Sequence, residues 1–107
     1  MSLSELQELL ESTEIPVTYQ SWPEGKAPEM PYICYQTPET NNFFADGKVF
    51  FSATSVTIDL YTRYVDPLTE VKLTNALDAA GCGWNRQEDH DKAENCFIIS
   101  YEIEVKK

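Results

Sequence analysis

The stretch that decides the fold runs from Pro31 to Tyr64 and reads PYICYQTPETNNFFADGKVFFSATSVTIDLYTRY. It contains runs of β-branched and aromatic residues that are typical of strands, separated by residues that are typical of turns. Within it, Val56, Ile58 and Leu60 occupy every second position, which is the period of a strand with one buried and one solvated face. The centre of the chain therefore predicts a sheet.

A β-hairpin is predicted inside this stretch. Asp46 and Gly47 form a strong hairpin signal, because both residues tolerate a positive φ. Phe43 and Phe44 precede this turn, and Lys48–Phe51 forms the return arm. Neighbouring residues of a strand point to opposite faces, so one phenylalanine of each adjacent pair can fill the core. The other is left for a loop, a second layer or another subunit.

Two amphipathic helices flank the central stretch. Ser2 and Glu5 form a capping-box pattern at the start of a run of leucines at helical spacing. This first helix is predicted to end within residues 13–16, because Pro16 disfavours helical geometry at the residue before it. Asp66 followed by Pro67 marks the second helix start, since the Asp side chain caps free amides and proline at the first position loses no available bond.

The second helix is predicted over Pro67–Ala80, and Gly81 fits its left-handed stop. Apolar residues at helical spacing form a stripe along it. The residues of this stripe are Leu73, Ala76, Leu77 and Ala80, with Leu68 and Val71 close to it.

Further strands complete the pattern. Phe97–Val105 alternates apolar and polar residues and predicts the last and longest strand. The polar stretch Gln87–Asn95 is predicted to be a turn or a long hairpin loop. The other strand-like segments are Val17–Gln20, Tyr32–Gln36 and Cys82–Arg86. The predicted order is helix, four strands, helix, two strands.

These elements predict a single domain over residues 1–107. A chain of this length can bury roughly two thirds of its unfolded surface. An antiparallel sheet with one apolar face must bury that face, and two amphipathic helices that pack on it would do so. The predicted fold class is therefore α+β, a two-layer sandwich of a mainly antiparallel sheet with two amphipathic helices on one face.

The composition disfavours several classes of partner. The chain has 18 acidic and 8 basic residues and a formal net charge of -10. This charge repels phosphates and anionic lipid headgroups, so sequence-specific nucleic-acid binding is not expected. No apolar run approaches the roughly 18 residues of a membrane span, and residues 1–13 do not look like a signal peptide. We expect a protein that is soluble and cytosolic when made.

The sequence offers no reaction centre that we recognise. Cys34, Cys82 and Cys96 lack the spacing of a zinc site and are expected to be buried thiols. His90 lies in an acidic run that we interpret as a solvated hairpin tip, because its spacing matches no calcium loop. Asp59 is expected on the solvated face of its strand. No catalytic residue, cofactor or metal is predicted, and enzyme activity is not expected.

The aromatic hairpin is the best candidate for an interaction surface. It is equally consistent with ordinary sheet residues covered by their own chain. In the functional interpretation it carries apolar area to a neighbouring subunit. The candidate interface residues are Glu39, Asn41, Asn42, Phe43, Phe44, Asp46 and Lys48.

Over nearly its whole length the chain resembles a small tail-component family from siphophages and prophages of Gram-positive bacteria. The resemblance is carried by the Pro-Tyr strand start at residues 31–32, the stretch Glu39–Lys48, the Asp-Leu-Tyr-Thr strand at residues 59–62 and the Asp-Pro helix cap at residues 66–67. It implies a tail-terminator or tail-completion protein that forms a homo-oligomeric ring at the head-proximal end of the tail. The implied partners are further copies of itself, tail-tube proteins and head-connector proteins. The implied location is the host cytoplasm during assembly and then the neck region of the virion tail.

Two other functions stay open. A head-tail joining component of the phage neck would share the acidic single-domain build but bind the connector instead of capping the tube. A host-type regulatory or inhibitory protein would use its acidic surface to mimic nucleic acid or to bind a basic partner.

Overall fold

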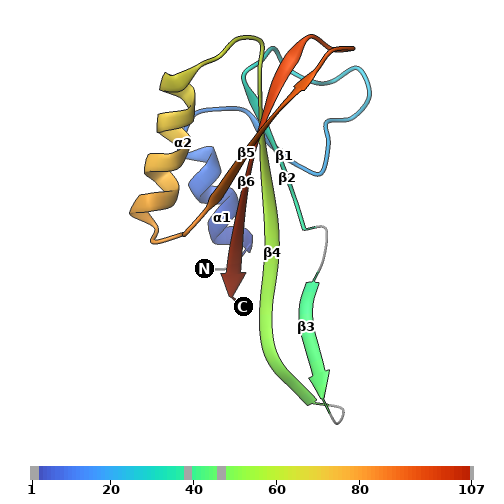
Figure 1. Cartoon of the computed structure of the whole chain (residues 1–107), viewed down its shortest axis with the longest axis vertical. Helices are drawn as coiled ribbons and strands as arrows, with labels where there is room; N and C mark the ends of the chain where they lie inside the picture. The colour runs from blue at the N-terminus through green and yellow to red at the C-terminus, as the bar shows by residue number, and fades with distance from the viewer. Residues whose placement is uncertain (1–2, 38–39, 46–47, 107) are drawn as a thin grey trace.

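The structure is a computed structural model that describes residues 3–37, 40–45 and 48–106, with only the backbone described for residues 40–45, 48–54 and 106. Its elements follow the predicted order of helix, four strands, helix, two strands. They are α1 (Leu3–Glu11), β1 (Val17–Tyr19), β2 (Tyr32–Gln36), β3 (Thr40–Ala45), β4 (Lys48–Thr62), α2 (Pro67–Ala79), β5 (Asn85–Asp91) and β6 (Cys96–Lys106) (Figure 1).

The strands form one sheet in the order β1-β2-β4-β6-β5, and β3 pairs with β4 beyond this path. All strand pairs are antiparallel except β1 with β2, which are parallel and are joined by the long loop over residues 20–31. The predicted α+β class with a mainly antiparallel sheet is therefore confirmed.

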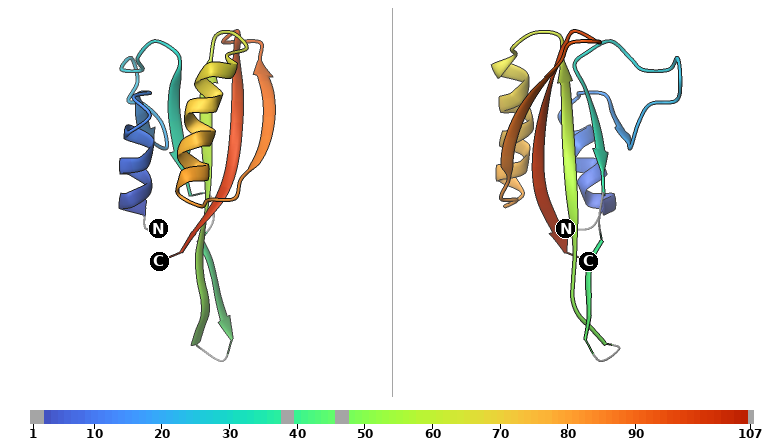
Figure 2. Two further views of the ribbon diagram at one scale, coloured as in Figure 1. Left: turned by 90° about the vertical axis from the view of Figure 1, so that its left-hand side faces the viewer. Right: turned by 45° about the vertical axis from the view of Figure 1, so that its right-hand side comes forward.

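Both helices contribute to one core on one face of the sheet. The register aligns Ile33, Leu60 and Ile99 across three neighbouring strands, and all three are buried. Figure 2 shows α1 and α2 side by side in front of the sheet. The helices add Leu6, Leu10, Leu73 and Leu77 to the core, and the strands add Tyr35, Val56, Ile58, Tyr101, Ile103 and Val105.

The ends of α2 form as the sequence predicts. Asp66 is the N-cap, and its Oδ1 accepts a hydrogen bond from the backbone amide of Thr69 at 3.2 Å. Gly81 has a φ of 75°, the left-handed conformation that ends many helices. No helix in the described ranges is both long and apolar enough to cross a membrane.

The prediction for residues 87–91 was wrong. A strand was expected over residues 82–86 and a turn or loop over residues 87–95, whereas β5 covers residues 85–91 and only residues 92–95 make the turn into β6. The strand is polar because six of its seven residues are exposed and it lies at the edge of the sheet. Hydrogen bonding to β6 overrides its low strand propensity.

The central strands also extend further than predicted. The predicted return arm Lys48–Phe51 and the alternating run Val56–Leu60 belong to the single 15-residue strand β4. Residues 40–42, which were expected to belong to the break after the strand Tyr32–Gln36, pair with β4 as part of β3. A long continuous partner strand explains both differences, because backbone pairing extends through polar and small residues.

Candidate interaction surfaces

The β3–β4 hairpin extends past the main sheet. Strand β4 pairs with β6 only from Ala53 onward and with β2 only from Thr57 onward. Among the described residues, Lys48–Ser52 therefore have β3 as their only strand neighbour. Figure 1 shows the two strands leaving the two-layer body as an arm at the end opposite the start of α2.

The structure gathers most of the predicted interface residues in this arm. Asn41, Asn42, Phe43 and Phe44 lie in β3, and Lys48 is the first residue of β4, opposite Ala45. Glu39 and Asp46 lie outside the described residues.

The register within the arm shifts once. Phe43 lies opposite Phe51, whereas Phe44 lies opposite Val49, so Phe50 is an extra residue on β4. Such a bulge increases local twist and bends the strand that carries it. This feature depends on the pairing of two distant segments, and nothing in the linear sequence marks its position.

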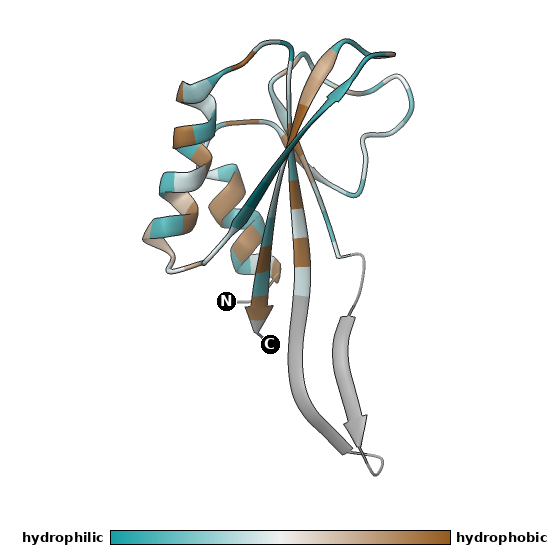
Figure 3. Cartoon of the chain, viewed as in Figure 1, coloured by the Kyte–Doolittle hydropathy of each residue, from teal (hydrophilic) through white to brown (hydrophobic). Residues whose placement is uncertain are grey.

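Sequence reasoning missed an exposed apolar patch at the start of α2. The exposed fractions of Tyr64, Val65, Leu68 and Val71 are 78, 65, 80 and 50%. We call these four residues the α2 patch. Figure 3 shows hydrophobic residues in the loop that leads into α2 and in the first turn of the helix.

The expected place of Leu68 and Val71 near the buried stripe was wrong. At about 100° per residue, Val71 lies roughly 160° around the helix from Leu73, and Leu68 roughly 140° from it. Leu73 and Leu77 are fully buried. A helical-wheel calculation anchored on these two leucines is the signal that places Leu68 and Val71 on the outer side.

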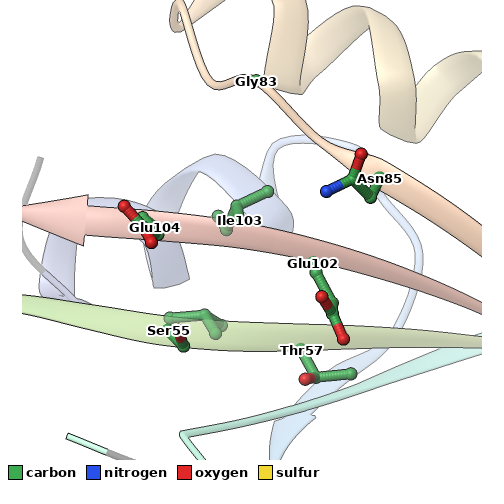
Figure 4. Close-up of a pocket in the computed structure, with 8 residues that line it drawn as sticks. Ser55, Thr57, Gly83, Asn85, Glu102, Ile103 and Glu104 are labelled. Carbon is green, nitrogen blue, oxygen red and sulfur yellow. The ribbon is translucent and has the colours of Figure 1, made fainter. Parts of the chain in front are cut away.

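A polar groove of about 630 Å³ crosses β4 and β6 near the start of β5. Its side chains include the carboxylates of Glu102 and Glu104, the amide of Asn85 and the hydroxyls of Ser55 and Thr57 (Figure 4). Gly83, Val56 and Ile103 complete its lining.

None of the residues that line the groove is a histidine or a cysteine. His90 is the chain's one histidine, and it lies five positions after Asn85 along β5, or roughly 17 Å along an extended strand. The His90 ring packs on Phe97 at the far end of β5, with the ring centroids 4.9 Å apart. Among the residues that the structure describes, no three His, Cys, Asp or Glu side chains come together as a metal-binding group.

Asp59 is more buried than the sequence predicts. It lies on the face of the sheet opposite the helices, and the Ser100 hydroxyl donates to its Oδ1 at 2.6 Å. Burial raises the pKa of Asp59, although the hydrogen bond from Ser100 acts in the opposite direction.

Its aromatic and thiol neighbours are also hard to ionise. Burial, with the charge of Asp59, raises the pKa of Tyr61 to about 12. Burial also raises the pKa of the Cys34 thiol, which leaves it a poor nucleophile at neutral pH. Cys34, Cys82 and Cys96 are free thiols, of which Cys34 and Cys96 are buried and Cys82 is partly buried.

Neither a search of protein-family models nor a search of curated proteins finds a match to this chain. Its family therefore stays a prediction from the sequence.

Proposed function

We propose that this chain is a non-enzymatic structural or assembly protein of a phage or prophage, acting as a tail-terminator or tail-completion ring subunit at the head-tail junction. Its partners in this proposal are further copies of itself, the tail tube and the head connector. It would act in the host cytoplasm during assembly and remain in the neck region of the virion.

One observation carries the proposal: the β3–β4 arm continues beyond every other strand of the sheet. Among the described strands, residues 48–52 pair only with β3, and β3 pairs only with β4. A two-stranded ribbon is only marginally stable by itself in water. An arm of this kind gains stability when it packs on a second molecule, and such changes on binding are common among proteins that assemble.

The charge of the chain is consistent with a position around a DNA conduit. A formal net charge of -10 per subunit repels a passing polyanion, and this repulsion is attenuated beyond about 10 Å at ordinary salt. A ring that attracted DNA would slow its passage.

The test is electron microscopy of particles from a prophage that lacks this gene, induced beside the same strain carrying the gene on a plasmid. Over-long tails without the gene, and tails of uniform length when it is restored, are the expected result.

Other outcomes would identify other functions. Filled heads that leak DNA, with tails of normal length, would indicate the head-tail joining role. A pull-down that recovers a basic enzyme and no phage structural protein would indicate a regulatory or inhibitory protein.

A further inference from the structure

We propose that the α2 patch of one copy is the docking site for the β3–β4 arm of a second copy, so that copies associate head to tail. This inference rests on the proposed function and names the surfaces through which a ring would close. Its first basis is exposure: four large apolar residues within eight positions are at least half exposed. Contiguous exposed apolar surface on a small domain commonly marks an interaction site.

The second basis is position. The arm and the α2 patch are connected through β4, which begins in the arm at Lys48 and ends at Thr62, two residues before the patch. Figure 1 shows the arm at one end of the molecule and the start of α2 toward the other, along a longest dimension of 48 Å. Two different surfaces at opposite ends make a heterologous contact, which repeats from copy to copy and closes into a ring when the rotation allows.

The third basis is the distribution of charge. Residues 40–77, which contain both the arm and the α2 patch, carry four acidic and three basic side chains, a net charge of -1. The remaining residues carry fourteen acidic and five basic side chains, a net charge of -9. Copies of so acidic a chain repel one another, and contact costs least where the charge is balanced.

The charges near the α2 patch in the sequence are also balanced, with two basic and two acidic residues. In the sequence, Arg63 and Lys72 flank the α2 patch, and Asp66 and Glu70 stand between its members. In the arm, the sequence of β3 contains no charged residue, and Lys48 is the one charged residue in the part of β4 that pairs with it. An apolar, nearly neutral occupant therefore suits the α2 patch better than an acidic or a basic partner.

Two variants separate head-to-tail contact from its alternatives. In the short-arm variant, an Asn-Gly turn replaces residues 43–51 and joins Asn42 to Ser52, which lie directly opposite each other in the hairpin. In the patch variant, Val65→Ser and Leu68→Ser remove apolar surface that is exposed in the single chain. Leu3→Ser is the matched control, because Leu3 is a 38% exposed leucine of α1 outside both surfaces.

The measurement is sedimentation velocity of the full chain, of each variant and of their equimolar mixture, at concentrations up to the solubility limit. Melting curves first show that each variant is folded. We expect the native chain and the Leu3→Ser control to associate at high concentration, and each test variant alone to stay monomeric. The mixture should form a pair that grows no further, because only the arm of the patch variant and the patch of the short-arm variant remain.

Each other outcome overturns the inference. Association of the short-arm variant alone would show patch-to-patch contact, and association of the patch variant alone would show arm-to-arm contact. If the native chain associates but the mixture does not, the contact between copies lies on other surfaces. If the native chain never associates, there is no such contact between copies. Over-long tails in the deletion strain could accompany any of these results, so failure of this inference is distinguishable from failure of the proposed function.

Discussion

The hydroxyl of Tyr101 donates a hydrogen bond to Oε1 of Glu70 at 2.9 Å and so ties β6 to α2. The same carboxylate oxygen accepts a hydrogen bond from Nε of Arg86 on β5 at 2.8 Å. Tyr101 is fully buried, and its ring packs against the ring of Trp84 with the two centroids 5.4 Å apart. This network holds the helix that carries the α2 patch in a fixed orientation on the sheet.

Tyr101→Phe should therefore destabilise the fold without changing its shape. The substitution removes a partly buried hydrogen bond to a carboxylate, which is worth about 1 to 2 kcal/mol of unfolding free energy. Urea unfolding measures this change. Tyr64→Phe is the control, because the Tyr64 side chain is 78% exposed and its substitution should cost less than about 0.5 kcal/mol. Equal losses in both variants would contradict the role of the network.

The orientation of α2 predicts opposite effects for two leucines of the same helix. Leu77→Ala should cost about 2 to 5 kcal/mol of unfolding free energy, because Leu77 is fully buried in the core. Leu68→Ala should stay within about 0.5 kcal/mol of the native chain, because Leu68 is exposed. Thermal or urea unfolding of the two variants checks this pair. A large loss at Leu68 would mean that α2 is rotated from the orientation described.

Asp59 should make stability depend on pH. Its pKa is raised in the folded state, so folding favours the protonated carboxyl and ionisation of Asp59 opposes folding. The contribution of Asp59 to the free energy of unfolding is therefore fully present at pH values below the pKa of Asp59 in the unfolded chain. It is lost as the pH rises through the pKa of Asp59 in the folded protein. Asp59→Asn should therefore unfold at a higher temperature than the native chain at neutral pH.

The difference in melting temperature between Asp59→Asn and the native chain should shrink as the pH falls into the acidic range. Measuring the difference between the two chains cancels the contribution of the other carboxylates. A difference that does not change with pH would show that ionisation of Asp59 is not its cause.

Shortening the arm should leave the body of the protein stable. The body pairing of β4 with β6 begins at Ala53, beyond the replaced residues 43–51. The short-arm variant should therefore melt within a few degrees of the native chain. Cooperative loss of the whole fold would instead show that the arm is part of the core.

The parts of the fold that sequence reasoning predicts are those specified by local patterns. The Asp66 cap and the Gly81 stop act within one turn of the helix, and both were predicted. The alternation in Val56–Leu60 and Phe97–Val105 placed the correct residues in the core, because each buried strand face must be apolar.

The parts that were missed depend on contacts between distant segments. β5 is polar and forms a strand only because its backbone pairs with that of β6. The register shift at Phe50 and the continuous length of β4 also depend on pairing. For the candidate surfaces, the hairpin was predicted from its turn residues, whereas the α2 patch required knowing which side of α2 faces the sheet.

The length distribution of tails assembled with the short-arm variant tests the central claim most directly. In a prophage that lacks the native gene, this variant and the native chain are expressed at equal levels, and tails are measured by electron microscopy. The arm is proposed to be the surface through which the protein acts, so the folded variant should give over-long tails while the native chain gives tails of one length. Tails of one normal length with the short-arm variant, as with the native chain, would contradict that role for the arm.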